Sequence, residues 1–142
     1  MPSPELERLV AIGQLQAEAP VKAELEGLVR GAEATLRDSR NVDLASESRF
    51  NLAYGAVHAL ALAALRWHGY RPRNRQIVFQ ALAHTLGTPA ATWRMLSKCH
   101  EQRNRREYEG LGEIDERLLA DLMAAGEDLL PQVLALGPFT HR

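Results

Sequence analysis

The chain has 142 residues, of which 46% are hydrophobic and 25% are charged, and these values are typical of one soluble globular domain. A single cysteine, Cys99, excludes an internal disulfide framework and a zinc site built on several cysteines. The longest apolar run is too short and too rich in alanine to span a bilayer, and no signal segment is visible at the start. We therefore expect a cytoplasmic protein without a membrane segment.

The net charge of −1 conceals a separation of charge along the chain. Residues 1–65 have a net charge of −3, residues 66–108 of +7, and residues 109–142 of −5. A basic middle of this kind often accompanies an anionic partner. The alternative is internal neutralisation, in which the basic middle packs beside the acidic ends.

Apolar residues recur at helical spacing, and Gly and Pro separate the periodic segments. The helices expected in chain order cover residues 4–15, 20–39, 44–68, 74–86, 89–108 and 113–136. We expect Thr88 to cap the fifth helix, with Pro89 at its first position. Short loops favour antiparallel neighbours, so the predicted fold class is all-α. The architecture expected is an up-and-down helical bundle of four main helices plus one or two short helices, forming a single domain with its core over about 20–136.

The fifth helix begins with an apolar face that becomes densely polar further along. His100, Asn104 and Tyr108 follow at intervals of four residues, and Arg103 lies beside them. Polar groups on an inward face need partners, a wet cleft or a ligand. The guanidinium group of Arg103 is suited to a phosphate or a carboxylate. The alternative is an ion pair between Arg103 and a buried Glu of the acidic last helix.

The third helix presents Asn51, Tyr54 and His58 on one side, and these are further candidate ligand-binding residues. A lone histidine such as His58 is more often a hydrogen-bonded core residue than a catalytic base.

The segment 66–75 holds four arginines and no acidic residue, with Trp67 and Tyr70 between the arginines. Basic groups that alternate with aromatic rings are typical of single-stranded nucleic-acid binding, because the rings stack on bases. Arg71 and Arg73 are therefore candidate ligand-binding residues. The alternative is that both aromatic rings close one end of the core. The sequence shows no phosphate-binding loop and no metal-ligand spacing of its histidines, so we expect no metal and no cofactor.

Three segments, Arg49–Leu60, Gly69–Pro72 and Arg103–Gly110, together resemble the HEPN superfamily (higher eukaryotes and prokaryotes nucleotide-binding). The resemblance covers about residues 20–135. It implies a small helical bundle that forms a homodimer. Many proteins of this superfamily are metal-independent ribonucleases, often toxins paired with a minimal nucleotidyltransferase antitoxin.

The superfamily motif is an Arg, commonly followed by Asn, and then a His after four to six intervening residues. Arg103 matches the motif Arg and Asn104 the residue after it, whereas the position of the His is taken by Tyr108, Glu109 or Gly110. Tyrosine titrates near pH 10 and is a poor base at neutral pH.

His100 precedes Arg103 by one turn and could replace the missing motif histidine in a catalytic role. Arg106, one turn after Arg103, is a further candidate for ligand binding.

Three functions are compatible with these residues. The first is a HEPN-like module that binds RNA, a nucleotide or a nucleotidyltransferase partner in a basic cleft, without efficient catalysis. The second is a metal-independent ribonuclease of a toxin–antitoxin pair, and the third is a dimeric helical scaffold.

Overall fold

The computed structural model describes residues 3–109 and 113–137, with the side chains of 107–109 outside the described part. In chain order the elements are α1 (Pro4–Ala11), β1 (Leu15–Ala17), α2 (Lys22–Ser39), α3 (Ser46–Trp67), β2 (Tyr70–Pro72), α4 (Arg75–Gln80), α5 (Leu82–Thr85), α6 (Ala90–Glu109) and α7 (Glu116–Leu134). The described part is thus mostly helical, which confirms the prediction of a helical chain.

Two of the expected helices are shorter or divided. The first, expected over 4–15, ends at Ala11 because Gly13 turns the chain with a φ of 80°, a conformation that glycine adopts without steric cost. The fourth, expected over 74–86, is divided at Ala81 into α4 and α5.

The fifth helix begins at Ala90, one residue later than expected. The carbonyl of Pro89 accepts the bond from the amide of Trp93 at 3.3 Å, so Pro89 precedes the helix. The hydroxyl of Thr88 is buried without a hydrogen-bond partner among the described residues, so the predicted Thr88 cap is wrong.

The two short strands were not predicted. β1 and β2 pair antiparallel, with Leu15 opposite Pro72 and Ala17 opposite Tyr70. Three residues are too few to show the alternation by which a strand is recognised in a sequence. The pairing holds the N-terminal segment against the end of α3.

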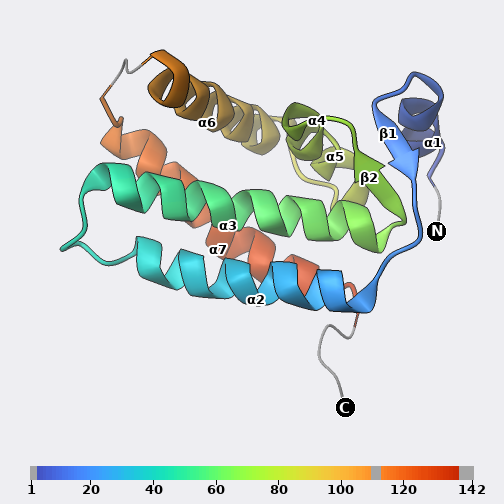
Figure 1. Cartoon of the computed structure of the whole chain (residues 1–142), viewed down its shortest axis with the longest axis horizontal. Helices are drawn as coiled ribbons and strands as arrows, with labels where there is room; N and C mark the ends of the chain where they lie inside the picture. Colours follow the sequence, from blue (N-terminus) through green and yellow to red (C-terminus); the bar gives the residue numbers. More distant parts are fainter. Residues whose placement is uncertain (1–2, 110–112, 138–142) are drawn as a thin grey trace.

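Helix α3 lies at the centre of the molecule, with α2 on one side, α6 and α4 on the other, and α7 behind it (Figure 1). Helix α7 contacts α2 and α6 as well as α3. The small residues of α3 let neighbouring helices approach closely. Gly126 of α7 shows how closely, because a Cβ at this position would lie 2.7 Å from Cδ1 of Leu36 and 3.3 Å from Cγ2 of Val57. Residues along most of α3 are therefore fully buried; they include Phe50, Ala53, Tyr54, Val57, Leu60, Ala64 and Leu65.

A second, smaller cluster of apolar residues lies beneath α1. Leu6 of α1 and Leu15 of β1 pack there against Leu65, Tyr70 and Ile77, and all five are buried. This cluster joins the N-terminal segment to the elements at the end of α3, at one end of the elongated molecule (Figure 1).

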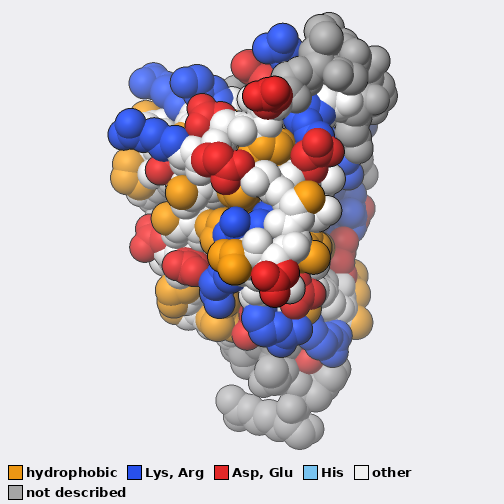
Figure 2. Space-filling model, turned by 90° about the vertical axis from the view of Figure 1, so that its left-hand side faces the viewer, with side chains coloured by type: hydrophobic (Ala, Val, Ile, Leu, Met, Phe, Trp, Pro, Cys, Tyr) orange, Lys and Arg blue, Asp and Glu red, His pale blue; other side chains and the backbone are white. Residues whose placement is uncertain are grey.

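The charges that are separated in the sequence are partly brought together in the fold. At the end of the molecule where α3 begins and α6 ends, Lys and Arg side chains are interspersed with Asp and Glu (Figure 2). Arg106 of α6 pairs there with Glu47 of α3 at 2.7 Å. Arg71 of the basic middle pairs with Glu18 of the first segment at 2.7 Å. Internal neutralisation therefore accounts for part of the charge pattern.

Candidate functional site

Helices α3 and α6 bring five of the sequence-predicted residues together. We call this group the polar cluster; its members are Tyr54, His58, His100, Arg103 and Asn104. Tyr54 is buried on α3 beneath α6, and the other four are partly buried. The polar face of α6, the fifth of the expected helices, thus faces α3, and α3 covers it only in part.

His100 is the centre of the polar cluster. Its Nδ1 lies 2.8 Å from the hydroxyl of Tyr54, and its Nε2 lies 3.2 Å from Nδ2 of Asn104. Each ring nitrogen of His100 therefore has one hydrogen-bond partner, Tyr54 at Nδ1 and Asn104 at Nε2, and the donor at each contact depends on the tautomer of His100.

Arg103 lies over the aromatic face of Tyr54, with its guanidinium carbon 5.2 Å from the ring centre. A guanidinium group over a tyrosine ring gains cation–π attraction and is held in place by it. The side chain of Arg103 is partly exposed.

His58 lies one turn beyond Tyr54 on α3. The two rings stack with centres 6.1 Å apart, and Phe79 of α4 packs edge-on against His58 at 5.8 Å. In the described part of the chain, the buried Nε2 of His58 has no hydrogen-bond partner. The expectation of a hydrogen-bonded core histidine is therefore not met.

The electrostatics of the polar cluster disfavour any additional positive charge. Burial lowers the pKa of His58 to about 4, and the charges of Arg75, His100 and Arg103 act in the same direction. The pKa of His100 is also lowered, by burial first and then by Arg103 and Arg75. Burial raises the pKa of the Tyr54 phenol. At neutral pH the cluster thus presents two neutral imidazoles and a neutral phenol beside two fixed cations.

Sequence reasoning missed two residues of α4 that complete this site. Phe79 supports the rings of Tyr54 and His58, and Arg75 adds the second cation. Arg75 follows Asn74, whose side chain caps α4 by accepting from the amide of Ile77 at 3.0 Å. The helix expected over 74–86 already placed Arg75 in a first turn, but no sequence signal indicated that this turn lies beside Tyr54 and His58.

The remaining predicted residues lie outside the polar cluster. Asn51 is exposed one turn before Tyr54, and Arg73 is exposed after β2. Arg106 is engaged by Glu47, as described above. Tyr108 belongs to α6, but its side chain lies outside the described residues.

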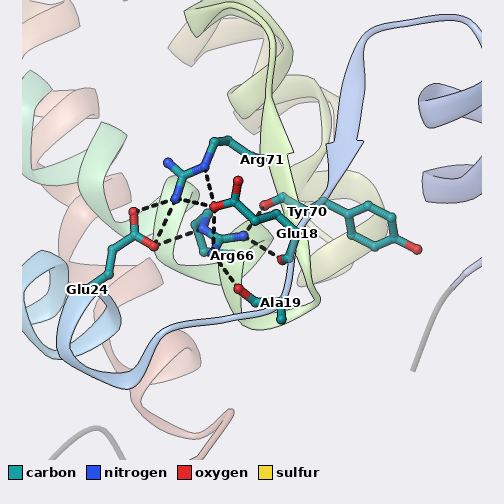
Figure 3. A network of polar contacts seen from close by, with 6 residues as sticks. All are labelled: Glu18, Ala19, Glu24, Arg66, Tyr70 and Arg71. Carbon is teal, nitrogen blue, oxygen red and sulfur yellow. Dashed lines mark hydrogen bonds and ion pairs between the residues drawn. The ribbon is translucent and has the colours of Figure 1, made fainter.

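Arg71 belongs to a separate ion-pair network around the fully buried Arg66 (Figure 3). Arg66 donates to the carbonyl oxygens of Glu18, Ala19 and Tyr70, at 2.8, 2.8 and 3.2 Å. Its Nε donates to Glu24 at 2.9 Å.

Arg71 pairs with the same carboxylates as Arg66, at 2.7 Å from Glu18 and 3.1 Å from Glu24. Burial raises the pKa of Glu24, but the hydrogen bonds from Arg66 and Arg71 outweigh it and lower the pKa overall. These two arginines are thus neutralised by acidic groups from the N-terminal third of the chain.

The aromatic residues of the basic segment do not form a stacking surface. Tyr70 is buried, its ring turns away from the arginines in Figure 3, and its hydroxyl donates to the carboxylate of Glu7. Burial and Glu7 raise the pKa of Tyr70 to about 12. Trp67 is partly buried against the main core. Both rings therefore close the end of the core, as the alternative expectation had it.

A shallow groove of about 570 Å³ lies between α6 and α7. Arg94 and Lys98 of α6 line one wall, and Asp115, Arg117 and Asp121 line the other. None of the predicted site residues lines this groove. Its lining mixes three cations with two carboxylates, which would repel a polyanion, so the groove is less suited to one than the polar cluster.

No protein-family model matches this chain, and no curated protein sequence matches it. Within residues 3–109 and 113–137, no helix is long and apolar enough to cross a membrane. The same residues contain no group of three His, Cys, Asp or Glu side chains arranged to hold a metal ion.

Proposed function

We propose that this chain binds the phosphate groups of RNA or of a nucleotide at Arg103 and Arg75, beside the polar cluster, without efficient catalysis. The observation that carries the proposal is the guanidinium group of Arg103, held over Tyr54 at 5.2 Å next to the neutral His100. An oriented guanidinium offers a phosphate two parallel charge-assisted hydrogen bonds.

The local charge also favours an anion. Both Arg75 and Arg103 lower the pKa values of His58 and His100, so both cations lie close to the same two imidazoles. A phosphate group bound there would be attracted by both cations.

The proposal of weak catalysis rests on the protonation states. A general base works best with a pKa near the operating pH, whereas the pKa of His58 is about 4 and that of Tyr54 is raised. Both nitrogens of His100 are already hydrogen-bonded. No described group near Arg103 is therefore well suited to remove a proton from a ribose 2′-hydroxyl at neutral pH.

The HEPN resemblance supports the same function, and it also supports an up-and-down arrangement of the helices. Helices α2, α3, α6 and α7 run in alternating directions along the molecule in Figure 1, as they would in an up-and-down bundle. The family resemblance also makes a homodimer and a nucleotidyltransferase partner part of this proposal. A metal-independent ribonuclease is the second candidate. It is favoured by the contact of His100 with Asn104, which lies one turn after His100 on α6.

The test is the affinity for a single-stranded oligouridylate of about ten nucleotides, measured by fluorescence anisotropy at low salt. We expect Arg103→Ala to weaken binding about 10- to 100-fold, the loss of one charge-assisted contact. Arg94→Ala is the matched control, since Arg94 lies on the same helix against Trp93, and we expect little change in affinity.

Equal losses in both variants, or none in either, would contradict the proposal. RNA cleavage by the wild-type protein in EDTA that disappears in Arg103→Ala would support the ribonuclease instead.

A further inference from the structure

The groove between α6 and α7 extends beyond the hollow of about 570 Å³ described above. A second hollow, of about 480 Å³, shares Met95 and Asp121 with it, and a third, of about 200 Å³, shares Lys98 and Leu118 with it. The lining on α6 runs over residues 91–105, which span about 21 Å at the usual rise of about 1.5 Å per residue. The groove is therefore as long as about four turns of a helix.

Apolar side chains lie along this groove. Met95 of α6 and Leu118 of α7 line it and are partly buried against the main core. Ala91, Ala124 and Ala125 also line it, and their short side chains leave space between the two helices. Such a groove suits the apolar stripe of an amphipathic helix, whose anchoring side chains recur every three or four residues.

Charged side chains flank these apolar residues and differ in sign between the two walls. Arg94 and Lys98 lie on the α6 wall, and Asp121 and Asp128 lie on the α7 wall. All four are exposed, and none of them takes part in an ion pair with another described residue. Only near the start of α7 do one carboxylate on the α6 wall and one arginine on the α7 wall reverse the pattern. The groove therefore complements a partner with acidic groups along one flank and basic groups along the other.

These features determine which class of molecule the groove fits. A nucleic acid would be attracted to the α6 wall and repelled by the carboxylates of the α7 wall. An extended peptide would leave backbone amides without partners, because both walls are helices and neither offers a strand edge. A helix satisfies its own backbone and needs only side-chain contacts. Helices α2, α3 and α7 already bury their apolar faces in the core of this chain, so the helix that fits comes from another protein.

We propose that the groove between α6 and α7 binds an amphipathic helix of a partner protein. The apolar stripe of that helix packs on Met95 and Leu118. Its acidic flank faces Lys98, and its basic flank faces Asp121. This inference is independent of the proposed function, because no residue of the polar cluster lines the groove.

Three synthetic peptides of about 18 residues test the proposal. All three carry the same leucines at helical spacing and differ only in the residues beside this stripe. The mixed peptide has Glu on one flank and Lys on the other, whereas the second has Glu on both flanks and the third has Lys on both. Fluorescence anisotropy at low salt measures their affinities for the wild-type protein. We expect the mixed peptide to bind about 10-fold more tightly than the other two, because it alone matches both walls.

Reversing one charge of the α7 wall should change this preference. In Asp121→Lys we expect the mixed peptide to bind about fivefold more weakly than in the wild type, and the peptide with Glu on both flanks about fivefold more tightly. Asp121 is an exposed helical residue, so the substitution should leave the fold intact. Asp43→Lys is the matched control. It makes the same change of charge in the exposed segment between α2 and α3, and it should bind all three peptides as the wild type does.

Equal affinities of the three peptides, or equal responses of Asp121→Lys and Asp43→Lys, would overturn the proposal. A dimer of the wild-type protein that dissociates in Asp121→Lys and persists in Asp43→Lys would assign the groove to a second copy of this chain instead. Saturating oligouridylate should not displace the mixed peptide. Binding of the mixed peptide by a protein that fails to bind oligouridylate would overturn the proposed function and leave this inference intact.

Discussion

Replacing Arg66 with methionine will lower the free energy of unfolding by about 2–5 kcal/mol, because it removes the donors of a fully buried network. Three carbonyl oxygens, those of Glu18, Ala19 and Tyr70, would lose a hydrogen bond from the guanidinium group. Glu24 would lose one of its two cationic partners. Urea denaturation followed by circular dichroism measures the change.

Arg37→Met is the matched control for Arg66→Met. Arg37 pairs with Asp38 at 3.6 Å, and both side chains are more than half exposed, at 72% and 56%. Exposed ion pairs contribute little to stability, so we expect the free energy of unfolding of Arg37→Met to change by no more than about 0.5 kcal/mol. The N-terminal segment should also be cleaved faster by a protease in Arg66→Met, because Arg66 holds Glu18 and Ala19. A stability of Arg66→Met equal to that of Arg37→Met would contradict the structural role of the network.

Replacing Phe79 with alanine will lower the free energy of unfolding by about 3–5 kcal/mol, the usual effect of removing a buried aromatic ring. Phe79 is fully buried and packs edge-on against Tyr54 at 5.9 Å and against His58 at 5.8 Å. The cavity would lie directly beneath the polar cluster, so we also expect water to reach His58 and its pKa to rise toward the usual value. Urea denaturation and the histidine signals in an NMR pH titration measure the two effects.

Phe79→Leu keeps most of the volume and should lose less stability, which separates the missing ring from the missing volume. Ile12→Ala, at a side chain that is 65% exposed, serves as the surface control and should change stability by at most about 0.5 kcal/mol. If Phe79→Ala were as mild as Ile12→Ala, the packing of α4 against α3 would have to be wrong.

The long helices could be predicted because their apolar stripes extend over several turns. The stripe of α2 is an example. Five apolar residues, Leu25, Leu28, Val29, Ala32 and Leu36, recur at helical spacing; four of them are buried, and Leu28 packs partly buried against the core. Short elements could not be predicted in the same way. β1 and β2 depend on each other and on Arg66, which lies far from β1 in the sequence. A local sequence pattern contains no information about such a long-range partner.

The polar cluster was partly predictable for a similar reason. The spacing of His100 and Asn104, and that of Tyr54 and His58, places each pair on one helix face. That the two faces meet depends on how α6 crosses α3, which helical spacing does not determine. Arg71 illustrates the converse, because its basic neighbours suggested an anion site, whereas the fold supplies Glu18 and Glu24 from the N-terminal segment.

The most direct test of phosphate binding at the polar cluster is an NMR titration of the labelled protein with oligouridylate. We expect the largest shifts at the imidazoles of His58 and His100, the side-chain amide of Asn104 and the guanidinium of Arg103. Shifts confined to the groove between α6 and α7, around Lys98 and Asp121, or the absence of any shift at saturating RNA, would contradict it.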